Sequence, residues 1–204
     1  MAIKAVIFDY GKVISFPPRN SVMEELANIS LIEASILEKL ILKHRGEFDR
    51  GTFSAKDYYK IILREAGVSF DGEKIEKMAD NDIKGWTSVN PETVSLMEEI
   101  KNAGYLLGIL SNMPYDFLAL HRNTFPVFKL THINIFSCEI GFIKPEKEIY
   151  EILLEKLLCT AEETVFFDDI QINVDRAKEI GIRAFLWEDV DKARRVLKSE
   201  GLLI

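Results

Sequence analysis

The chain has 204 residues, of which 48% are hydrophobic and 29% carry a charge. These proportions are those of an ordinary folded protein and argue against disordered and fibrous classes. The 33 acidic side chains outnumber the 26 basic ones, and the net charge is −7 at pH 7. Because no basic run offsets this charge locally, we expect neither nucleic acid nor an anionic membrane as a partner.

Cysteine usage and apolar runs bear on the cellular location. Cys138 and Cys159 lie far apart and form no Cys-x-x-Cys pair, which predicts neither a disulfide framework nor a metal clip. The first apolar run stops at Phe8, too early for a signal-peptide core, and no later run is long enough to span a bilayer. We therefore expect a cytoplasmic protein.

The stretch from Lys4 to Val13 joins a short apolar run to a carboxylate and a glycine. Ala5 to Phe8 predict a strand that is buried on both faces, and Asp9 follows it in a tight loop. Ligands of an open parallel sheet bind beyond the carboxyl ends of the strands. Asp9 is therefore the first candidate for the chemistry.

Residues 16–85 form a helical block. Phe16-Pro17-Pro18-Arg19 breaks regular structure, because each proline fixes φ and lacks a backbone donor. Apolar residues then recur at helical spacing from Ser21 to about Ile83. Since no convincing strand pattern interrupts this block, we predict a small all-helical unit inserted into the chain.

The remainder alternates strands with helices. The expected strands span 105–110, 133–136, 164–167 and 183–187, and the expected helices span 91–104, 145–158, 173–180 and 192–198. This alternation predicts an α/β fold, a doubly wound parallel-sheet, Rossmann-like core. The predicted core domain comprises 1–15 and 86–204, and the inserted helical domain comprises 16–85.

Polar residues stand at the ends of the predicted strands, where the strands themselves do not need them. Asp9 follows the first, Ser111-Asn112 the second and Asp168-Asp169 a later one, and Lys144 precedes a helix. In a parallel sheet these ends open on one edge. Carboxylates, a hydroxyl and a lysine suit phosphoryl chemistry, in which Mg²⁺ neutralises the repulsion between a phosphate dianion and a carboxylate nucleophile.

Three residues receive catalytic roles. Asp9 is expected to attack phosphorus and form an aspartyl-phosphate that water then cleaves. Lys144 is expected to offset the developing negative charge, and the Ser111 hydroxyl to donate to a phosphate oxygen. Asn112 joins Ser111 and Lys144 as a substrate-binding candidate, while a helix-capping role for Ser111 is an equal alternative.

The metal ligands are expected close by. Asp9, Asp169 and the backbone carbonyl of Gly11 supply oxygen atoms of the kind that Mg²⁺ prefers. Asp168 is either a weaker ligand or a support for the direct ones. Asn173 either assists the metal through water or caps the following helix.

Four motifs in order resemble the haloacid dehalogenase superfamily of phosphatases and related hydrolases. They are Phe8-Asp9-Tyr10-Gly11-Lys12-Val13, Leu110-Ser111-Asn112, Gly141-Phe142-Ile143-Lys144-Pro145, and Phe166-Phe167-Asp168-Asp169 through Asn173 to Gly181. The resemblance implies that the inserted helices are a C1-type cap, which closes over the site and selects the substrate.

The helical block also carries a resemblance of its own. The loop Phe48-Asp49-Arg50-Gly51-Thr52-Phe53 is similar to one in the cap of the alpha-D-glucose-1-phosphate phosphatase-like branch. Arg50 in this loop is a candidate substrate contact, but Asp49-Arg50-Gly51 is also an ordinary turn, and we favour the turn.

Gly11 departs from the superfamily pattern. Phosphatases of the superfamily usually carry a second aspartate at this position, as general acid to the leaving group and base to water, but the glucose-1-phosphatase-like branch tends to have glycine. A general acid contributes roughly 10²–10⁴ in rate. We therefore expect a preference for anomeric, acyl or aryl phosphates over simple alkyl phosphates.

The sequence thus predicts a magnesium-dependent phosphatase for a small phosphorylated metabolite, with sugar phosphates as the leading class, working as a monomer or homodimer. One alternative is a metal-independent 2-haloacid dehalogenase, since such members also lack the second aspartate, although Asp168-Asp169 argues for a metal. The other is a catalytically silent member that binds a phosphorylated ligand or a protein partner, for which Gly11 is the only support.

Overall fold

The computed structural model describes residues 2–202 and places five strands in one parallel sheet. The strands are β1 (Ala5–Phe8), β2 (Leu106–Ser111), β3 (Ile133–Phe136), β4 (Thr164–Asp168) and β5 (Arg183–Leu186). Their order is β3-β2-β1-β4-β5, so the chain adds two strands on one side of β1 and then two on the other. This confirms the predicted doubly wound parallel sheet.

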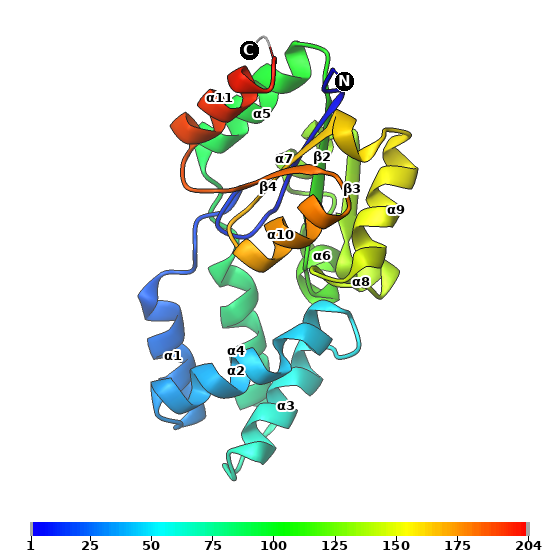
Figure 1. The fold of residues 1–204 in the computed structure, drawn as a ribbon. Coiled ribbons are helices and arrows are strands. Elements are labelled where there is room, and N and C mark those ends of the chain that lie inside the picture. Colours follow the sequence, from blue (N-terminus) through cyan, green and yellow to red (C-terminus); the bar gives the residue numbers. More distant parts are fainter. Residues whose placement is uncertain (1, 203–204) are drawn as a thin grey trace.

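Helices cover both faces of the sheet (Figure 1). The long ones are α5 (Pro91–Asn102), α9 (Lys147–Leu157), α10 (Gln171–Glu179) and α11 (Val190–Ser199). Successive side chains of a strand point to opposite faces, and both faces of β1 are buried. Val6 and Phe8 share a core with α5 and α11, whereas Ala5 and Ile7 share one with α9 and α10.

Short helices in the connections after β2 and β3 were not predicted from the sequence. They are α6 (Tyr115–His121), α7 (Pro126–Leu130) and α8 (Ser137–Ile140), and a 3₁₀ turn, η1 (Ala161–Glu163), precedes β4. Segments of four to seven residues are too short to show a helical period. Within residues 2–202, no helix combines the length and the apolar character that crossing a membrane requires.

The inserted block consists of four helices at one end of the core (Figure 1). They are α1 (Asn20–Ser30), α2 (Ala34–Asp49), α3 (Ala55–Glu65) and α4 (Gly72–Gly85). Its entry and exit run side by side, because Ser15 pairs with Val89 in an antiparallel bridge and the Phe16 N–H donates to the Ser88 carbonyl. We refer to this block as the cap; the exact domain limits stay a prediction.

Gly108 provides a test of the sheet packing. A Cβ atom at this position would lie 2.7 Å from Ile133 Cγ2 and 2.7 Å from Ile7 Cδ1. Both neighbours lie on strands that pair in the sheet, so we expect Gly108→Ala to lower the free energy of unfolding by about 1–3 kcal/mol in urea titrations. Gly72→Ala is the control, because a Cβ there meets no atom within 4 Å. Unchanged stability of Gly108→Ala would contradict this packing.

Candidate active site

A cavity of about 470 Å³ lies between the carboxyl ends of the strands and the cap. The core residues that line its floor include most of the predicted site: Asp9, Gly11, Ser111, Asn112, Lys144 and Asp169. The cap supplies the roof from α2, α4 and the two prolines of the connection. The topology therefore brings together residues that are more than 150 positions apart in the sequence.

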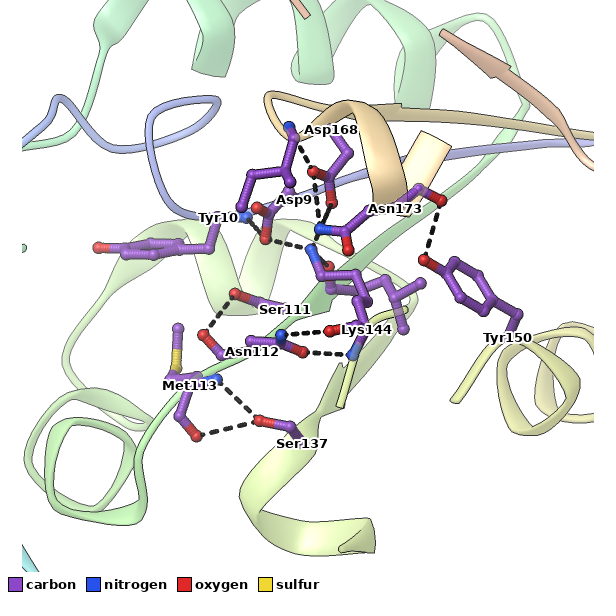
Figure 2. A network of polar contacts seen from close by, with 12 residues as sticks. Asp9, Tyr10, Ser111, Asn112, Met113, Ser137, Lys144, Tyr150, Asp168 and Asn173 are labelled. Atoms are coloured by element: carbon purple, nitrogen blue, oxygen red, sulfur yellow. Dashed lines mark hydrogen bonds and ion pairs between the residues drawn. The ribbon is translucent and has the colours of Figure 1, made fainter. Parts of the chain in front are cut away.

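Lys144 lies at the centre of the floor (Figure 2), and its side chain is 1% exposed. Its Nζ lies 2.8 Å from Asp9 Oδ1 and 2.6 Å from Asp168 Oδ2, and it donates to the Leu110 carbonyl at 2.9 Å. An ammonium has three N–H donors, and these contacts use them all. Burial alone would lower the pKa of Lys144, but Asp168 and Asp9 outweigh it and raise that pKa.

Asp168 is fully buried, and its carboxylate forms an ion pair with the Lys144 ammonium. Its carboxylate also accepts from Asn173 Nδ2 at 3.0 and 3.2 Å and from the Ile170 N–H at 2.8 Å. Asn173 is held in turn, since its carbonyl accepts the Tyr150 hydroxyl at 3.0 Å. Three donor groups thus make four contacts with this carboxylate, which is well placed to orient Lys144 and has little acceptor capacity left for a metal.

The Asn112 side chain contacts the backbone of Lys144 at two points. Its Oδ1 accepts the Lys144 N–H at 2.7 Å, and its Nδ2 donates to the Lys144 carbonyl at 3.0 Å. These bonds fix the loop that carries the lysine. Ser111 differs, because its hydroxyl lies 3.5 Å from the Asn112 carbonyl, a long contact that leaves the hydroxyl able to turn toward a ligand.

Three carboxylates converge on one side of the floor. Asp9, Asp168 and Asp169 can each offer an oxygen atom, and these atoms lie within 4.8 Å of one another. Burial raises the pKa of Asp9 to about 7; the negative charges of Asp168 and Asp169 raise it as well, whereas Lys144 lowers it. Burial also raises the pKa of Asp169, which Lys12 opposes. A hard divalent cation relieves this repulsion, and the all-oxygen donor set fits Mg²⁺.

The Trp86 side chain from the end of α4 lies against Gly11. A Cβ atom at Gly11 would lie 3.4 Å from Trp86 Cζ3, and the Tyr10 hydroxyl donates to the Trp86 carbonyl at 3.0 Å. An aspartate at position 11 would therefore extend into space that this indole borders. The end of the cap thus borders the position at which the superfamily resemblance would place a second aspartate.

Arg50, predicted as a substrate contact, is engaged elsewhere. Its guanidinium forms two bonds to the Glu146 carboxylate, at 2.7 and 2.8 Å, and a third to the Gly141 carbonyl at 2.8 Å. Glu146 also accepts the Ile143 N–H at 2.9 Å. Arg50 therefore ties the cap to the loop on which Lys144 lies.

Four roof residues were not assigned a role from the sequence. They are Arg45, Asp49, Asp82 and Trp86. Arg45 and Asp49 form an ion pair four residues apart on α2, a spacing visible in the sequence, but such pairs usually lie on solvated helix faces. No pattern indicates that α4 brings Asp82 to the same place.

Comparison with known proteins supports the fold. The chain is 27% identical over 182 residues to a sesquiterpene phosphatase, astK, of Aspergillus oryzae, which covers 88% of this chain and 87% of that protein. A crystal structure of an enzyme from Bacteroides thetaiotaomicron, in complex with magnesium and inorganic phosphate, has a TM-score of 0.73 at 22% identity, over 92% of this chain and 95% of that one.

A shorter match involves much larger proteins. Over 65 residues the chain is 39% identical to bifunctional epoxide hydrolase 2 of Rattus norvegicus. This segment makes up 32% of this chain and 12% of that protein. The model of the haloacid dehalogenase-like hydrolase family matches residues 3–181. The chain therefore belongs to this family, as the four motifs predicted.

Proposed function

We propose that the chain is a magnesium-dependent phosphatase that hydrolyses a small phosphate monoester through an aspartyl-phosphate on Asp9. The observation that carries this proposal is the placement of Asp9 on the cavity floor, 2.8 Å from the Lys144 ammonium and within the group of three carboxylates. Relatives named as phosphatases support it. A cytoplasmic location and a monomer or homodimer stay predictions.

The residues suited to hold Mg²⁺ are Asp9, Asp169 and the carbonyl of Gly11. The ion would neutralise the charges of the carboxylates and the phosphate. Asp168 remains within the group, but three donors already make four contacts with its carboxylate. We therefore assign Asp168 to orienting Lys144 and Asp169 to direct binding.

The chain's own residues then account for both steps. In the first step an Asp9 oxygen bonds to phosphorus, and the bond from phosphorus to the leaving oxygen breaks. In the second step water adds to phosphorus, the bond to Asp9 breaks, and phosphate leaves. Lys144 stabilises the ionised form of Asp9, and the Ser111 hydroxyl is free to donate to a phosphate oxygen.

The leaving oxygen receives no proton from position 11. Weakly basic leaving groups need this proton least, so we propose anomeric sugar phosphates, and acyl or aryl phosphates, as the preferred class. The similarity to the glucose-1-phosphatase-like cap loop supports sugar phosphates among these.

Metal removal tests the first part of the proposal. We expect Mg²⁺-dependent release of inorganic phosphate from acetyl phosphate and phenyl phosphate, loss of release in excess EDTA, and recovery on adding Mg²⁺. Asp9→Asn removes the nucleophile and should lower release by at least about 10³-fold. Release that persists in Asp9→Asn would contradict the assignment of the nucleophile.

A panel of leaving groups tests the second part. Glucose 1-phosphate and phenyl phosphate should show kcat/KM values at least about tenfold above that of glucose 6-phosphate, because the last releases a basic primary alkoxide. Equal values would mean that another group supplies the proton. No release from any member, combined with thermal stabilisation by phosphate, would favour the silent binder, and Mg²⁺-independent halide release from a 2-haloacid would favour the dehalogenase.

The two adjacent aspartates can be separated by titrating activity with Mg²⁺. Asp169→Asn should raise the Mg²⁺ concentration for half-maximal activity by roughly tenfold or more, since it alters a direct ligand. Asp168→Asn should instead lower kcat, because Lys144 loses one of its two charged partners, with a smaller change in the Mg²⁺ requirement. The reverse pattern would exchange the two roles.

A further inference from the structure

The roof of the cavity combines apolar side chains with one buried ionic group. Its apolar members are Pro17, Pro18, Ile41, Leu42, Ile83 and Trp86. Among them lie Arg45 and Asp49 of α2 and Asp82 of α4, which also line the cavity. The side chains of these three are 25%, 10% and 16% exposed. We call these three residues the roof triad.

Arg45 is already engaged within the triad. Its Nε lies 2.8 Å from Asp49 Oδ1, and its Nη1 lies 3.8 Å from Asp82 Oδ2. The guanidinium carbon also lies 5.6 Å from the centre of the Phe48 ring and 5.8 Å from that of Trp86. One cation thus faces two carboxylates, and the triad carries a net charge of −1. A second anion entering the roof would meet these two carboxylates beside the one cation.

The α2 part of the triad is tied to the core that builds the floor. The Ser137 hydroxyl donates to the Asp49 carbonyl and accepts the N–H of Met113 at 2.9 Å. Met113 follows Ser111 by two positions, so this contact reaches the floor. A Cβ atom at Gly51 would lie 3.0 Å from the Cys138 carbonyl oxygen, so the cap loop packs closely on the core. Burial raises the pKa of Asp49, whereas the charges of Arg45 and, to a smaller extent, Lys144 lower it.

These observations concern the part of a substrate that does not react. With phosphate on the floor, the leaving group extends toward the roof, because that is the remaining space of the cavity. We propose that the roof triad is a specificity determinant, which admits neutral leaving groups and rejects those that carry a second phosphate or a carboxylate. This inference rests on the proposed phosphatase function and narrows its substrate class.

The physical reason is the balance of charge in the roof. An anionic substituent meets two carboxylates and only one arginine, which already faces both of them, so the net charge around the substituent is repulsive. A hydroxyl can instead donate to an oxygen of Asp49 or Asp82, and an apolar body can pack on Ile83 and Trp86. The expected substrates are monophosphates of neutral sugars, polyols, phenols or apolar alcohols.

Two aryl phosphates of nearly equal shape test this inference. They are 4-carboxyphenyl phosphate and 4-carbamoylphenyl phosphate, which differ mainly in the charge at the end that faces the roof. Phenyl phosphate is the reference for activity. We expect the wild-type kcat/KM for the carboxylate to be at least about 30-fold below that for the amide. The difference should lie mainly in KM, because both leaving groups depart as substituted phenoxides.

Variants of the triad locate the source of the discrimination. Asp82→Asn and Asp49→Asn each leave the triad neutral, and either should reduce the ratio of amide to carboxylate kcat/KM by about fivefold or more. The matched control is Asp80→Asn, also on α4, because the Asp80 side chain is 68% exposed and pairs with Lys84 outside the active-site cavity. This control should keep the wild-type ratio.

The outcomes distinguish this inference from the proposed function. If the wild type does not release phosphate from phenyl phosphate or from the amide, the proposed function fails. If it hydrolyses both but accepts the carboxylate equally well, the function stands and the inference is overturned. A strong preference for the amide that neither Asp82→Asn nor Asp49→Asn changes would also overturn it, since another feature would then reject the anion.

Discussion

The contact on which the site depends is the buried ammonium of Lys144 between two carboxylates, Asp9 and Asp168. Removing such charges from water is costly, and their attraction compensates only when hydrogen bonds satisfy the remaining donors and acceptors. Here the Leu110 carbonyl takes the third N–H of Lys144, and Asn173 and the Ile170 N–H complete the contacts of Asp168. Removing any one member of this network would therefore leave a buried charge or polar group without a partner.

This completeness links distant parts of the chain. Asp9 follows β1, Asp168 ends β4, and Asn112, next after β2, holds the backbone of Lys144. β1 pairs with both β2 and β4 in the sheet, so the residues that follow these strands lie at the same edge. The cap attaches to the same structure through Arg50 and Glu146 and through Asp49 and Ser137. The position of the roof thus follows from the loops that build the floor.

The core was readily predicted because its signals are local. Apolar runs of four to six residues, each followed by a polar residue, identify β1, β2 and β4 and place Asp9, Ser111 and Asp168 at one edge. The short helices after β2 lack a period, and they were missed. The sequence favoured Asp169 as the direct ligand but left open whether Asp168 is a weaker ligand or a support, since that depends on which carboxylate faces Lys144.

The roof could not be predicted, because it depends on the packing of helices against one another. The spacing of Arg45 and Asp49 fits an exposed helix pair as well as a buried one, and only the approach of α4 decides between them. The same limit applies to Arg50, where the motif indicated a substrate contact. Its guanidinium instead matches the Glu146 carboxylate with two parallel bonds, a geometry that no one-dimensional pattern records.

Gly11 and the roof triad act on the leaving group in different ways. Because position 11 supplies no acid, the enzyme favours leaving groups whose oxygen is weakly basic. The triad instead selects against negative charge on the rest of the leaving group. Trp86 connects the two, since its ring borders Gly11 and also lies near the Arg45 guanidinium. A Cβ atom at position 11 would lie in van der Waals contact with this indole, 3.4 Å from its Cζ3 atom, so the catalytic loop and the wall of the roof lie close together. Gly11 therefore lies where the floor of the cavity meets its roof, and Gly11 and the triad together favour a neutral leaving group with a weakly basic oxygen.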